Sequence, residues 1–200
     1  MYKTIISSSL ATALGLSLAM TTQAADQGHG KVTFKGEIVN APCSIAPESV
    51  DQVVYLGQIS NSALAASGES TPKPFSIELE DCDFGTATQP NLATGAVSIT
   101  FSGSTVDLGN SITALGVTGF GGDPLAGNVG IIISSAANNE AIKFGTAQNL
   151  NGMLQPGYNT MNFSAYLKTK DTATTAADIP LGEFQGITNF TLSYISLNLI

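Results

Sequence analysis

The hydrophobic pattern of the chain is that of short β-strands. Strict alternation of apolar and polar residues is typical of a half-buried strand, because successive side chains point to opposite faces of a sheet. Alternating runs cover residues 31–40, 75–79, 97–101, 161–168 and 183–194. Shorter continuous apolar runs cover 53–56 and 129–134, and the second of these resembles a strand buried on both faces.

Turn-forming residues separate these runs. Clusters of Gly, Pro, Asn and Ser lie between them, and residues 63–66 are expected to form a single helical turn. No long linker and no internal repeat divides the chain. About seven short strands between turn clusters predict one all-β domain, for which an immunoglobulin-like β-sandwich is the economical arrangement.

The two ends of this domain carry the most regular alternation. Near the C-terminus, one face collects Phe184, Gly186, Thr188, Phe190, Leu192 and Tyr194. Near the N-terminus, one face collects Val32, Phe34, Gly36 and Ile38, and the other collects Lys31, Thr33, Lys35 and Glu37. A chain with a patterned strand at each end is suited to pairing with other chains.

The first residues resemble a secretory signal. Lys3 precedes an apolar stretch at 10–20, and small residues lead to an expected cleavage between Ala24 and Ala25. The apolar stretch is shorter than the about 20 residues of a membrane-spanning helix, although a short membrane anchor is the alternative. We therefore expect an exported mature chain of residues 25–200.

The expected export bears on the redox state of the two cysteines. Cys43 and Cys82 are expected to form one disulfide, since oxidising compartments favour it. A metal site would need further ligands, and the single histidine, His29, lies near the start of the mature chain. Two free thiols remain the alternative.

Charge and composition argue against several functions. The net charge is −8 at pH 7, and the sequence has no Arg, so phosphate or nucleic-acid binding is disfavoured. A hydrolase of the Ser–His type would have to rely on His29. The acidic residues near Cys82 match no Ca²⁺ loop and are expected to be a solvated strand end; they are Glu78, Glu80, Asp81 and Asp83. We expect no enzyme activity, no metal and no cofactor.

Four motifs, in order, resemble those of bacterial chaperone–usher pilins, close to type 1 fimbrial major subunits. With Ile195 as the last residue, Tyr194 is penultimate and Gly182 is the fourteenth residue from the end. The other motifs are residues 30–43 (Gly-Lys-Val-Thr-Phe-Lys-Gly-Glu-Ile-Val-Asn-Ala-Pro-Cys), 75–83 (Phe-Ser-Ile-Glu-Leu-Glu-Asp-Cys-Asp) and 128–133 (Asn-Val-Gly-Ile-Ile-Ile). The resemblance extends over essentially the whole mature chain.

The resemblance implies a fold and a mechanism. Such pilins are incomplete immunoglobulin-like sandwiches whose missing strand is supplied first by a periplasmic chaperone and then, at an outer-membrane usher, by the next subunit. The implied donor residues are Gly28, Gly30, Val32, Phe34 and Gly36. The implied acceptor residues are Gly182, Phe184, Phe190, Leu192 and Tyr194. Expected partners are identical or related pilin subunits, the chaperone and the usher, and the expected location is a fimbria on the cell surface that supports adhesion.

Domain boundaries follow from the same comparison. We expect a signal peptide at 1–24, a donor extension at 25–36, a pilin domain at 37–195 and a C-terminal extension of unknown role at 196–200. Three alternatives remain: a minor adaptor pilin, a self-contained secreted sandwich that binds carbohydrate or another surface, and a closed sandwich in which both terminal runs are ordinary core strands.

Overall fold

The computed structural model describes residues 30–84 and 93–196. The expected signal peptide with its cleavage site at Ala24 and Ala25, the expected donor residue Gly28 and residues 197–200 lie outside the described residues. The chain divides into two compact units, Met1–Ile38 and Val39–Ile200.

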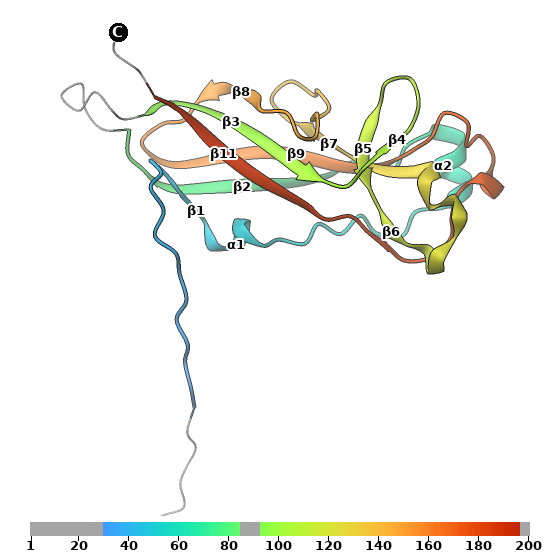
Figure 1. Cartoon of the computed structure of the whole chain (residues 1–200), viewed down its shortest axis with the longest axis horizontal. Coiled ribbons are helices and arrows are strands. Elements are labelled where there is room, and N and C mark those ends of the chain that lie inside the picture. The colour runs from blue at the N-terminus through green and yellow to red at the C-terminus, as the bar shows by residue number, and fades with distance from the viewer. Residues whose placement is uncertain (1–29, 85–92, 197–200) are drawn as a thin grey trace, which may run out of the picture. The chain divides into compact units, whose positions relative to one another are not determined.

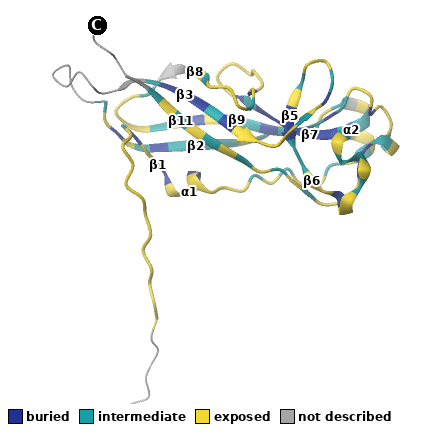
Figure 2. Cartoon of the chain, viewed as in Figure 1, coloured by how far each residue is buried: buried dark blue, intermediate teal, exposed yellow. Residues whose placement is uncertain are grey.

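The described part of the first unit, residues 30–38, contains no helix or strand. Its apolar side chains are exposed, with Val32 at 76%, Phe34 at 90% and Ile38 at 101% of full accessibility (Figure 2). Alternation therefore does not produce a strand here within the single chain, because a β-strand also needs a neighbour for its backbone hydrogen bonds.

The second unit contains two main antiparallel sheets (Figure 1). The larger has the order β1 (Ser44–Ile45), β2 (Lys73–Cys82), β9 (Gly157–Thr169), β7 (Val129–Ser135), β5 (Thr113–Gly116) and β4 (Thr105–Asp107). The smaller has the order β11 (Thr188–Ser196), β3 (Ala93–Gly103) and β8 (Gln148–Met153). A short pair joins β10 (Phe184–Gln185) to β6 (Thr118–Gly119).

Short helices occupy the connections. They are α1 (Pro47–Val50), α2 (Asn61–Ser67), η1 (Phe120–Gly122), η2 (Pro124–Asn128) and η3 (Ala176–Asp178). The helix α2 is longer than the single turn expected at 63–66. The Ser60 side chain accepts a hydrogen bond from the Ala63 N–H at its start, and Gly68 ends it with a φ of 74°.

The main core lies between the two sheets. Ile77 and Leu79 of β2 and Ile99 of β3 are 0% exposed, and the Phe101 ring meets the Phe163 ring edge-on with centroids 5.5 Å apart. All residues from Val129 to Ile133 are buried. The strand predicted at 129–134 is therefore confirmed, including its burial on both faces.

Other expectations differ from the structure. The apolar run 53–56 forms no strand. The sequence pattern does not predict the strands β4, β5 and β8, because two of them are very short and β8 reads as a polar, Gly-containing loop. The last run is divided at Gly186 and Ile187, so that β10 pairs with β6 while β11 pairs with β3.

Candidate strand-acceptor edge

The strand β11 is paired on one side. Its register with β3 places Phe190 beside Phe101, Leu192 beside Ile99 and Tyr194 beside Val97. In the described part of the chain, β11 is the terminal strand of its sheet. Its second row of backbone N–H and C=O groups therefore forms a sheet edge, which is a place where another strand can add.

Burial differs sharply between β11 and its partner. On β3, the inward side chains of Val97, Ile99 and Phe101 are 3%, 0% and 2% exposed. On β11, the inward side chains are only half-buried although they pack against the same core; they are Phe190, Leu192 and Tyr194. Figure 2 shows this alternation of half-buried and exposed positions along β11. The core is thus covered fully under β3 and incompletely along β11.

Tyr194 lies at the C-terminal end of this edge. Partial burial raises the pKa of its phenol above the ordinary value, because the charged form would lose hydration. The phenol is therefore neutral at physiological pH and acts as an amphipathic side chain, with an apolar ring against the core.

The glycines that precede β11 are required by geometry. Gly182 has a φ of 126°, which L-residues with side chains rarely adopt, and a Cβ there would lie 3.2 Å from the Phe120 Cα. The turn at Gly182 brings Phe184 onto Phe120, with ring centroids 5.5 Å apart. A Cβ at Gly186 would lie 2.9 Å from the Ile131 Cδ1. Both glycines let the chain cross close to the core before β11 begins.

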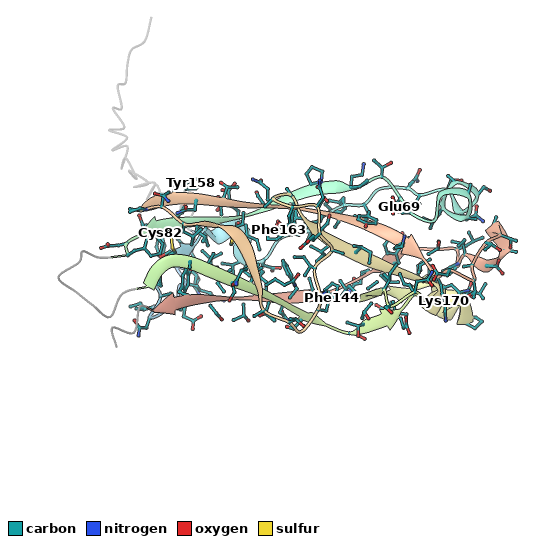
Figure 3. All side chains as sticks on the ribbon, turned by 90° about the horizontal axis from the view of Figure 1, so that it is seen from above. Glu69, Cys82, Phe144, Tyr158, Phe163 and Lys170 are labelled. Atoms are coloured by element: carbon teal, nitrogen blue, oxygen red, sulfur yellow. A yellow bond between two sulfur atoms is a disulfide. The ribbon has the colours of Figure 1, made fainter. Side chains whose placement is uncertain are left out.

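The disulfide joins Cys43 and Cys82, as expected, with a Cα–Cα distance of 4.1 Å (Figure 3). Both residues are 4% exposed and belong to the main core cluster. The Asp83 N–H also donates to the Pro42 C=O at 2.8 Å. These bonds attach the segment before β1 to the C-terminal end of β2.

The structure brings some of the predicted site residues together and separates others. Phe190, Leu192 and Tyr194 follow one another on one face of β11. Phe184 belongs to β10 and packs against a different apolar cluster, and Gly182 forms the preceding turn. Gly30, Val32, Phe34 and Gly36 belong to the other unit. Sequence reasoning missed Gly103, where a Cβ would lie 2.9 Å from the Ile187 C=O oxygen; its only signal is a glycine within a strand.

The profile of the fimbrial protein family matches residues 32–195. The chain belongs to the fimbrial protein family. The fimbria A protein of Serratia marcescens is 43% identical over 92% of this chain and 95% of its own length. The major MR/P fimbria protein of Proteus mirabilis is 41% identical over 92% of this chain and 97% of its own length.

Solved structures of other fimbrial proteins resemble this fimbrial subunit. A chain from a chaperone–usher pilus structure that reports on rod uncoiling aligns with a TM-score of 0.66 and 33% identity, covering 84% of this chain and 97% of that one. The P pilus rod subunit PapA aligns with a TM-score of 0.60 and 28% identity, covering 78% and 100%. The sandwich is therefore the immunoglobulin-like pilin fold.

Membership of this family fixes the general role. The protein is a structural subunit of a fimbria, not an enzyme, and fimbriae are extracellular surface structures built from related subunits. Within the described residues, no helix has the length and apolar character needed to cross a membrane.

Proposed function

We propose that this pilin polymerises by donor-strand exchange, in which the donor extension of one copy, residues 25–36, adds along β11 of another copy. The observation that carries the proposal is the incomplete cover of Phe190, Leu192 and Tyr194 on a strand that ends its sheet within the described residues. The exposed Val32 and Phe34 are the complementary feature, because they alternate with polar residues as a half-buried strand requires.

The chemistry of the two segments is complementary. Burying a Val or Phe side chain fully stabilises a complex by about 1.5–3 kcal/mol. Each backbone hydrogen bond to the β11 edge adds about 0.5–1.5 kcal/mol. A Cβ added at Gly30 or Gly36 would meet no atom within 4 Å in the free segment, so the free segment itself does not require glycine at these positions. In the assembled state the two glycines would allow close approach of two backbones.

Before assembly, the same edge is a hazard. An unpaired strand with apolar neighbours promotes aggregation unless another chain covers it. We therefore infer that a periplasmic chaperone covers β11 and that an outer-membrane usher exchanges it for the donor of the next subunit. A structure of a chaperone–usher pilus among the similar proteins supports this route. An export signal at 1–24 and the Cys43–Cys82 disulfide suit passage through an oxidising periplasm.

The domain boundaries and the assignment as a major rather than a minor subunit belong to the same proposal. Residues 25–36 are the donor extension, 37–195 the acceptor domain and 196–200 an extension beyond it. We infer a major rod subunit that supports adhesion by building the fimbria. The proteins named as major pilins among its relatives support this over a minor adaptor.

Filament assembly tests the proposal. The variant Phe34→Asp places a charge where the donor needs an apolar side chain, and it is expected to abolish filaments while its chaperone complex still forms. Lys35→Asp is the matched control, because Lys35 lies on the opposite, polar face and filaments should persist. Cells that also produce the chaperone and usher of a related fimbria would be examined by electron microscopy. Normal filaments from Phe34→Asp would contradict the donor role of Phe34.

A further inference from the structure

The sandwich has a second long edge, at β2. This strand pairs with β9 from Lys73 to Cys82, whereas on its other side the strand pairing among the described residues is that of β1 with Leu79 and Glu80. Residues 73–78 therefore line the end of the larger sheet. Ile77 and Leu79 of this strand share the main core cluster with Phe190 and Leu192 of β11. Both strands border one core, so an incoming strand with apolar side chains could pair with either of them.

The backbone groups of β2 that face this edge can be identified. Glu78 directs both of its backbone groups away from β9: its N–H donates to the Ser49 Oγ at 3.0 Å, and its C=O accepts from the Ala46 N–H at 2.9 Å. Hydrogen-bonding direction alternates along an antiparallel strand. Ser76 and Pro74 therefore face the edge in the same way as Glu78.

At each of these positions, a backbone group that an added strand would need is either already hydrogen-bonded or missing. The Ser76 C=O accepts a hydrogen bond from the Gln52 Nε2 at 3.1 Å. Pro74 has no N–H to offer. An added strand would need the bonds that the side chains of Ser49 and Gln52 already occupy, and it would find no donor at Pro74.

The short helix α1 explains why side chains replace a strand here. Pro47 starts the helix directly after β1, because proline suits the first helical turn. The chain thereby leaves the strand direction, and Ser49, 3% exposed, points to the Glu78 N–H. We call α1, Gln52 and Pro74 together the edge cap. By contrast, β11 contains no proline over its nine residues.

We propose that the edge cap closes β2 to strand addition and so directs the donor strand to β11. This inference rests on the proposed donor-strand exchange and adds a specificity determinant to it. Residues 49, 52 and 74 thus act by excluding a competing edge, without touching the donor in its assembled place.

The test removes part of the edge cap and measures whether a second strand then binds at β2. The double variant Gln52→Ala with Pro74→Val frees the Ser76 C=O and introduces an N–H at position 74, and both replaced residues are exposed. A labelled peptide of residues 28–38 is supplied in large excess while the full chain refolds at low concentration, so that the peptide fills free edges before other copies do. Amide hydrogen exchange then locates the peptide. For the wild type we expect about one peptide per chain, with new protection in 188–196 and none in 73–78. For the variant we expect about two, with new protection in 73–78 as well.

The controls separate the possible failures. Pro156→Val removes an exposed proline outside the strands and should behave as the wild type. Pro74→Val alone is the second test, since it leaves the Gln52 hydrogen bond in place and should gain weaker protection at 73–78. Unchanged exchange at 73–78 in both opened variants overturns the edge cap. Absence of protection at 188–196 in every protein instead contradicts donor-strand exchange, and the comparison at 73–78 still decides the edge cap.

Discussion

Phe34 provides the sharpest prediction on donor energetics. In a protein that carries a second copy of residues 28–38 after its last residue, this copy can fill the β11 edge of its own chain. Phe34 is 90% exposed in the free segment, so its insertion removes almost the whole side chain from water. Truncating a buried Phe to Ala costs about 3–5 kcal/mol in a closed core and about 1.5–3 kcal/mol by transfer alone.

We therefore expect Phe34→Ala in the added copy to lower the free energy of unfolding by about 2–4 kcal/mol. For a domain of this size, each kcal/mol shifts the melting temperature by about 2–4 °C, which gives a loss of about 4–16 °C. Urea unfolding and thermal melting, both at low protein concentration, would measure these changes.

Lys35→Ala in the same copy is the matched control, because its side chain lies on the polar face of the donor. Its effect should stay within about 0.5 kcal/mol. If Phe34→Ala and Lys35→Ala had equal, small effects, Phe34 would not be buried in the complemented protein, and the assignment of the donor face would be wrong.

Three further predictions concern the sandwich itself. Replacing Cys43 and Cys82 by Ser opens a loop with a sequence separation of 39 residues, and denaturant unfolding should show a loss of about 4 kcal/mol relative to the oxidised protein; equal stability would contradict a structural role. Gly103→Ala should cost about 1–3 kcal/mol in the same assay, because its Cβ would meet a backbone atom, the Ile187 C=O oxygen, at 2.9 Å, whereas Gly127→Ala, with nothing within 4 Å, is a near-neutral control. The Thr175 hydroxyl and N–H hold the pKa of Asp178 below its ordinary value of 3.8, so this carboxylate stabilises the fold above pH 3.8 and the contribution is lost as the pH falls through the lowered pKa. Melting temperatures measured across this range should therefore fall less steeply for Asp178→Asn, and parallel curves would exclude the contribution.

Most core strands could be read from the sequence. Alternation at 75–79, 97–101 and 161–168 marks strands that lie on the common core, and each is longer in the structure than its apolar pattern. The pattern extends only as far as one face stays buried, whereas backbone pairing with a neighbour continues beyond it. Strand ends are therefore set by pairing, which the sequence pattern does not report.

Other elements depend on tertiary context. Residues 53–56 are apolar, yet Val53 and Tyr55 are 72% and 83% exposed, so this run is not a core strand in the single chain. The break between β10 and β11 also gave no periodic signal, because Gly186 keeps the alternation while the pairing partner changes. The edge cap was missed since Ser49 and Gln52 act through single hydrogen bonds to a distant strand.

The acceptor face could be predicted in part. Alternation placed Phe190, Leu192 and Tyr194 together, and they do share one face of β11. The pattern could not tell a half-buried face in a closed sandwich from one that awaits another strand. The contrast between the buried side chains of β3 and the half-buried ones of β11 supports the second reading, which the sequence pattern does not report.

Completion of the sandwich by a strand from another copy is the step on which the proposed function depends. The most direct measurement compares the mature chain, residues 25–200, with the same chain carrying a second copy of 28–38 at its end, both produced without a chaperone. Sedimentation and thermal melting of the two proteins would be measured side by side. We expect the unmodified chain to aggregate or polymerise and the added strand to give a stable monomer. A stable monomer of the unmodified chain with no gain from the added strand would contradict completion by another copy.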